Sequence, residues 1–125
     1  MMQGPLVISS LVLVGLAACS RSCPESDLAF AVRRHCERFA WDLTHAARRA
    51  AAGKDAGVAA SHVGATFSFC LSARRLDPRV EAATSTRFGI LEQELHEALD
   101  RREAARLLGA MAEEATSVAK LPLKP

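Results

Sequence analysis

The sequence lacks several residue types and patterns, and each absence narrows the possible classes of protein. The 125 residues include no tyrosine and no asparagine, so no N-glycosylation site exists. The 16 basic and 14 acidic residues leave a net charge of only +2, which gives no strong field for binding nucleic acid. Half of the residues are hydrophobic, which excludes an intrinsically disordered chain.

Short motifs that mark common catalytic sites are also absent. There is neither a G-x-S-x-G nucleophile turn nor a glycine-rich phosphate-binding loop. The cysteines form neither C-x-x-C nor C-x-x-C-H, the patterns typical of thioredoxin-like redox sites and c-type haem attachment. We therefore predict that the protein is not an enzyme, needs no cofactor and binds no nucleic acid.

The N-terminal segment differs from the rest because no charged side chain precedes Arg21. Leu6 to Ala18 is a run of 13 residues, apolar apart from two serines and one glycine. A helix needs roughly 20 residues to cross the hydrocarbon core of a bilayer, so this run is short for a membrane span. Its length is typical of the hydrophobic region of a signal peptide, although residues 1–5 contain no Lys or Arg.

The apolar run ends in Leu16-Ala17-Ala18-Cys19, which resembles the lipobox of bacterial lipoprotein precursors. The resemblance implies that residues 1–18 are removed as a signal peptide and that Cys19 carries acyl chains, palmitate among them. It also implies a membrane-anchored protein facing the periplasm, with residues 19–22 as the lipidated tether. Because Ser20 follows the cysteine in place of Asp, the resemblance favours the outer membrane in a Gram-negative host. Two alternatives stay open: a secretory signal cut after Ser20, and an uncleaved membrane anchor.

The rest of the chain predicts an all-α protein, an antiparallel bundle of three or four helices over residues 23–120. Ser22-Cys23-Pro24-Glu25 matches a capping box, and Gly53 is a natural stop for the first helix. A second helix is expected from about Ala56 to Leu76. Its apolar residues form two stripes, which predicts a largely buried helix. The stripes contain Val58, His62, Ala65, Phe69 and Leu76, and Val63, Phe67 and Cys70.

Two aspartates predict the remaining helix starts. Asp77 precedes Pro78, so it can cap a third helix with proline in its first turn. The apolar register, which runs through Leu95 and Leu99, slips at Asp100. That slip indicates either a fourth helix capped by Asp100 or one long bent helix. The tail Leu121–Pro125 cannot continue as helix, so we expect an extended, frayed end or a peptide that docks.

The cysteines predict one disulfide. In a helical hairpin that turns near Lys54, Cys36 lies 18 residues before the turn and Cys70 lies 16 after it. That mismatch is about 3 Å along the axis, whereas Cys23 would miss Cys70 by roughly 22 Å. Since a disulfide tolerates Cα separations only up to about 7 Å, we predict a Cys36–Cys70 bridge and leave Cys23 unassigned. The alternative is that Cys36 and Cys70 are buried free thiols.

Two groups of side chains are candidates for binding. Glu92, His96 and Asp100 recur at steps of four and could offer three ligands to a divalent metal, but a solvated polar face is the favoured interpretation. Phe30 and Trp41 lie three turns apart on one side of the first helix. We expect them to pack on another helix; if exposed, they would form an aromatic patch for a partner.

These observations predict a small lipid-anchored helical protein with a binding or scaffolding role, acting on a protein partner that the sequence does not identify. One alternative is a metal-binding or metal-sensing lipoprotein that uses Glu92, His96 and Asp100. Another is an inhibitor or immunity lipoprotein that blocks a specific partner.

Overall fold

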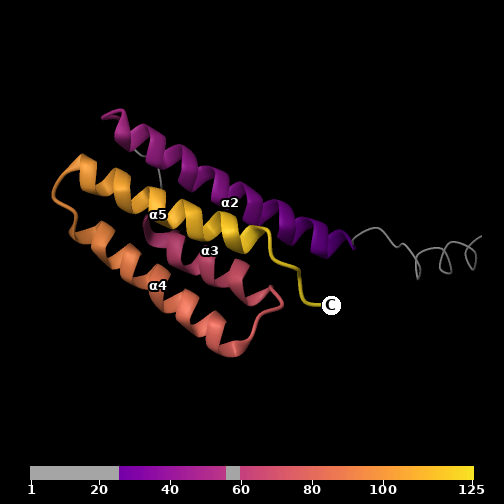
Figure 1. The fold of residues 1–125 in the computed structure, drawn as a ribbon. Helices are drawn as coiled ribbons and strands as arrows, with labels where there is room; N and C mark the ends of the chain where they lie inside the picture. Colours follow the sequence, from indigo (N-terminus) through magenta and orange to yellow (C-terminus); the bar gives the residue numbers. More distant parts are fainter. Residues whose placement is uncertain (1–25, 56–59) are drawn as a thin grey trace, which may run out of the picture. The chain divides into compact units, whose positions relative to one another are not determined.

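The computed structural model describes residues 26–55 and 60–125. These residues form four α-helices and no strand, which confirms the expected all-α bundle (Figure 1). The helices are α2 (Asp27–Ala51), α3 (Ala60–Ser72), α4 (Pro78–Glu97) and α5 (Arg101–Ala119). The expectations for the signal segment, the lipobox, Cys19, Cys23 and the capping box at residues 22–25 lie outside the described residues.

Ala31–Pro125 forms one compact unit, and Ser26–Phe30 is described by itself. In that short stretch, the Ser26 hydroxyl accepts a hydrogen bond from the backbone N–H of Ala29 at 3.1 Å. Ser26 therefore caps the first turn of α2. At its other end α2 stops at Ala51, and Gly53 follows with a φ of +75°. The predicted stop is confirmed, since glycine adopts this left-handed conformation without steric cost.

Helix α3 ends earlier, and its described part is less buried, than the sequence indicates. It ends at Ser72, so the predicted end at Leu76 is wrong. Only one of its two apolar stripes is buried, the one with Val63, Phe67 and Cys70. Phe69, on the other stripe, remains 50% exposed.

The early end of α3 has a structural cause in the C-terminal tail. The N–H of Arg75 donates to the carbonyl of Pro122 at 2.8 Å, and the N–H of Lys124 donates to the carbonyl of Ala73 at 2.9 Å. Arg74 and Leu123 thus form an isolated antiparallel bridge. The expectation of a frayed tail is wrong, because these backbone bonds tie it to the end of α3.

Helices α4 and α5 are separate helices, capped as the aspartates predict. The Asp77 carboxylate accepts from the N–H of Arg79 at 2.8 Å, and the Asp100 carboxylate accepts from the N–H of Glu103 at 2.8 Å. Helix α4 ends at Glu97, and Leu99, which was expected to extend its apolar stripe, is fully exposed. The register slip at Asp100 therefore marks a break between helices.

The core of the bundle is continuous and draws on all four helices. Cys36 and Leu43 come from α2, while Met111 and Val118 come from α5. Phe67 of α3 stacks on Phe88 of α4, with ring centroids 3.7 Å apart. Alanines at 40, 46, 50, 112 and 115 complete the core and leave little side-chain bulk between α2 and α5. On the bundle surface, Arg87 of α4 pairs with Glu114 of α5 at 2.5 Å.

Candidate functional site

The predicted disulfide is present, and it is a structural bridge. Cys36 of α2 is bonded to Cys70 of α3, with their Cα atoms 5.7 Å apart. Both residues are almost fully buried, at 1% and 2% exposure. A thiol needs access to its reaction partner to exchange, so this position suits a stabilising bridge between two helices and not a redox site.

The three candidate ligands for a metal ion, Glu92, His96 and Asp100, do not share a helix face. Helix α4 ends at Glu97, so Asp100 lies beyond it and caps α5 through its bond to Glu103. Residues 26–55 and 60–125 contain no group of three or more His, Cys, Asp or Glu side chains placed to hold a metal ion. The premise of the metal site is therefore wrong. Glu92 and His96 remain one turn apart on α4.

Trp41 is 55% exposed, so the expectation that it packs on another helix is wrong; Phe30, considered separately, is 56% exposed. Trp41 is nevertheless held in place. The His45 ring stacks on it with centroids 5.1 Å apart and planes 5° from parallel. The Arg38 guanidinium lies 4.8 Å from the Trp41 ring centroid, and its Nε donates to Asp42 at 3.1 Å. The result is an exposed aromatic surface with a cation beside it.

A groove with a volume of about 530 Å³ runs beside Trp41, between α2 and the C-terminal end of α5. We call it the Trp41 groove. Arg48 and Lys120 supply positive charge along it, and Glu37 is its acidic residue. The full lining consists of Glu37, Ala40, Trp41, Thr44, His45, Arg48, Thr116, Ala119 and Lys120. The groove therefore combines an exposed aromatic ring with a net positive rim.

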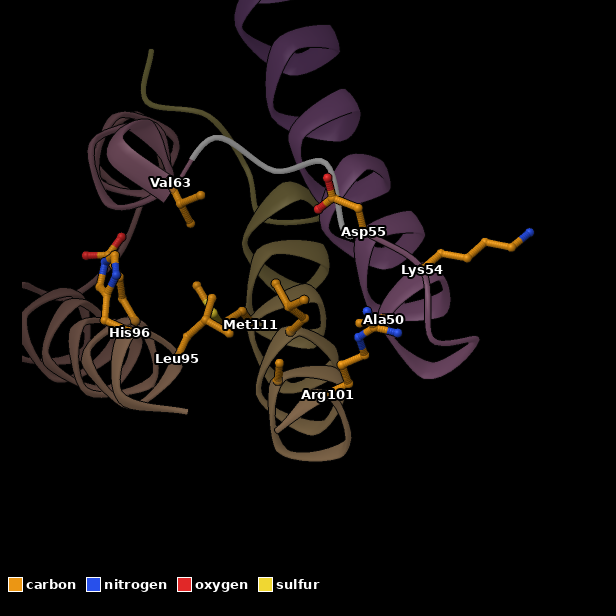
Figure 2. A pocket seen from close by; sticks show the side chains of 11 residues that line it. Ala50, Lys54, Asp55, Val63, Leu95, His96, Arg101 and Met111 are labelled. Atoms are coloured by element: carbon orange, nitrogen blue, oxygen red, sulfur yellow. The ribbon is translucent and has the colours of Figure 1, made fainter. Parts of the chain in front are cut away.

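A second hollow, of about 380 Å³, lies at the other end of α5; we call it the Met111 cavity. Figure 2 shows Val63 and Leu95 on one side of it, Ala50 and Arg101 on the other, and Met111 between them. Its lining also includes Lys54, Asp55, Glu92, His96, Ala104 and Leu108. Small-molecule sites have this character, an apolar interior with a few polar groups at the mouth.

Three pKa changes belong to two surface ion pairs, away from both hollows, and one of them is the raised pKa of Arg106, caused by its hydrogen bond to Glu103. The hydrogen bond from Arg87 to Glu114, together with the charge of Glu114, raises the pKa of Arg87. The hydrogen bond from Arg106, only partly opposed by desolvation, lowers the pKa of Glu103. Ion pairs at the protein surface contribute little to stability, so these two pairs add only modestly to that of the bundle.

His62, which the sequence places on an apolar stripe of the second helix, is exposed. The Met111 cavity was missed by sequence reasoning, since its walls come from segments far apart in the chain.

Comparisons with protein-family models, with curated proteins and with solved structures found no match for this chain. Among the described helices, none combines the length and the apolar character that crossing a bilayer requires.

Proposed function

We propose that the protein is an exported, lipid-anchored binding protein that engages a protein partner through the Trp41 groove. The carrying observation is that Trp41 is exposed and yet stacks on His45 and contacts Arg38. Tryptophan and arginine are enriched among residues that dominate binding energy. A ring already held in place loses little conformational freedom when a partner covers it.

The charges of the groove indicate the chemistry of the partner. Arg48 and Lys120 outnumber Glu37 on its rim, so an acidic surface surrounding an apolar contact complements it best. The bridged cysteines support the export half of the proposal, because disulfides persist in oxidising compartments and are rare in the cytosol. The resemblance of Leu16–Cys19 to a lipobox supports the anchor.

Export and anchoring predict a specific mass. The protein extracted from membranes should have the mass of residues 19–125 plus acyl chains, because lipid would be attached to Cys19. Intact mass spectrometry before and after base hydrolysis of the ester-linked chains measures this. A serine at position 19 is the control: Cys19→Ser should leave the chain unacylated. Retention of Met1, or an unacylated chain starting at Arg21, would contradict the anchor.

Partner binding predicts a large effect of one exposed side chain. Trp41→Ala should weaken the complex at least tenfold, because it removes the ring that the groove presents. Ile90→Ala is the matched control, since Ile90 is also 55% exposed but lies on α4. The measurement is the dissociation constant for a partner isolated by cross-linking through a photoreactive residue at Thr44, within the groove.

Equal dissociation constants for the Trp41→Ala and Ile90→Ala variants would contradict the groove as the binding surface. The activity of the partner then decides between two roles. If binding abolishes that activity, the protein is an inhibitor or immunity lipoprotein. If it does not, the protein acts as a scaffold or docking subunit.

A further inference from the structure

The floor of the Met111 cavity is apolar and well buried. Val63 of α3 and Leu108 and Met111 of α5 are 5%, 3% and 0% exposed, and all three line the hollow. Leu95 of α4 forms part of the same wall (Figure 2). A ligand entering here would therefore bury an apolar body against aliphatic side chains, which supplies affinity without specificity.

The basic groups at the mouth of the cavity are already engaged or point elsewhere. Arg101 donates a hydrogen bond from Nη1 to the carbonyl of Gly53, at the end of α2. The Lys54 side chain extends away from the hollow in Figure 2. Arg101 is thus tied to the end of α2 and Lys54 extends away from the apolar floor, which leaves Glu92 and His96 as the polar side chains on the α4 wall.

Glu92 is the acidic group that remains available. Its side chain is half-buried and lines the cavity, and no residue of the described part of the chain hydrogen-bonds or ion-pairs with its carboxylate. His96, one turn further along α4, lines the same wall and is likewise without such a partner among those residues. A carboxylate beside an apolar wall attracts a cationic partner more strongly than a carboxylate in bulk water does, because the effective dielectric constant is lower there.

A glycine on the facing helix makes room for this carboxylate. A Cβ atom placed on Gly64 of α3 would lie 2.8 Å from both carboxylate oxygens of Glu92. No real side chain tolerates that separation, so the absence of a Cβ at Gly64 allows the Glu92 carboxylate to lie against α3. The position of the negative charge beside the cavity therefore depends on Gly64.

We propose that the Met111 cavity binds a small ligand that joins a protonated amine to an apolar body. Glu92 accepts hydrogen bonds from the ammonium group, His96 contributes a ring nitrogen beside it, and the apolar body occupies the space above Met111. This site is separate from the Trp41 groove, and its occupancy does not depend on the partner proposed there.

The test uses a matched pair of probes. The two compounds, 2-phenylethylamine and 3-phenylpropanoate, share a phenyl ring and a two-carbon chain but carry opposite charges. Binding is followed in the full chain through the methyl signal of Met111 labelled with ¹³C, identified by its loss in Met111→Leu. Because the Met111 side chain lies at the floor of the cavity, its signal should respond when a ligand occupies the space above it.

We expect the amine to shift the Met111 signal with saturation, and the carboxylate to bind at least tenfold more weakly. Glu92→Gln should remove that preference. Gly64→Ala should weaken amine binding in the same direction, because it displaces the carboxylate without removing it. Since only the flexible end of the Glu92 side chain has to move, this variant should keep its fold. Glu94→Gln on the same helix is the control and should bind as the wild type does, because Glu94 does not line the cavity.

Three results would overturn the proposal. They are an unshifted Met111 signal at millimolar amine, equal affinities for the two probes, and amine binding unchanged in both Glu92→Gln and Gly64→Ala. A helical circular dichroism spectrum for each variant separates loss of binding from loss of fold.

Discussion

Replacing Cys36 and Cys70 together by alanine should lower the free energy of unfolding by about 3–4 kcal/mol, the largest effect we expect from any change in this chain. The bridge joins residues 34 positions apart, and in the chain-entropy model it restricts an unfolded loop of that length. It also lies in the core, with both cysteines almost fully buried, so its loss removes packing as well.

Denaturant unfolding with and without a reducing agent measures this effect. Reduction of the wild-type protein should lower its stability by a similar amount and leave the double variant unchanged. If the reduced wild-type protein unfolds at the same denaturant concentration as the oxidised one, the bridge contributes nothing to stability, and its assignment as a stabilising link between α2 and α3 is wrong.

Arg74→Ala should destabilise the protein by about 3 kcal/mol, even though arginine is usually a surface residue. Arg74 is 1% exposed. Its Nε donates to the carbonyl of Cys70 at 3.3 Å, and its Nη1 donates to the carbonyl of Leu121 at 2.9 Å. Removing the guanidinium leaves these buried carbonyls without their charged donor and opens a cavity where α3 meets the tail.

The neighbouring Arg75→Ala is the control, because the Arg75 side chain is exposed and only its backbone N–H bonds the tail. It should change the free energy of unfolding by no more than about 0.5 kcal/mol. Arg74→Lys should recover only part of the loss, since an ammonium group cannot reproduce two directed bonds from a planar guanidinium. Thermal unfolding of the three variants tests the argument. Equal midpoints for Arg74→Ala and Arg75→Ala would show that the buried guanidinium does not hold the tail.

The parts of the fold that were predictable from the sequence depend on local chemistry. Asp77 and Asp100 mark helix starts because an N-cap aspartate accepts a hydrogen bond from a backbone N–H only two or three residues further along the chain. Gly53 marks a stop because its left-handed conformation is a property of one residue. The Cys36–Cys70 pair follows from counting outward from that stop, which requires only that two successive helices lie side by side.

The parts that were not predictable depend on partners distant in sequence. Helix α3 reads as continuing to Leu76, and only the C-terminal tail, which pairs with Ala73 and Arg75, explains its end at Ser72. The sequence predicts that Trp41 packs on another helix, yet the side chains that contact its ring are His45 and Arg38 of the same helix. A hydrophobic pattern identifies side chains that favour burial, but whether another helix reaches them is decided by the packing of the whole bundle.

The candidate sites also combine features that the local sequence predicts with features that depend on residues distant in sequence. Spacing alone placed Glu92, His96 and Asp100 together, and the break after Glu97 separated the last of them from the other two. The proximity of Gly64 to Glu92 has no local sequence signal, because the two residues lie on different helices. Glycine inside a helix is unfavourable for helix formation, so Gly64 itself is the local feature that could have indicated a close approach to α3.

The bridge between α2 and α3 has a topological consequence for a chain held at its N-terminal end. Residues 36–70 form a closed covalent ring that contains the turn at Gly53. A protease that cuts once within this ring opens it but separates nothing, because the two pieces remain joined through sulfur. On the proposed anchor, α4 and α5 would thus stay attached to the membrane after such a cut. The same cut in a reduced molecule would leave the second piece with noncovalent packing as its only attachment.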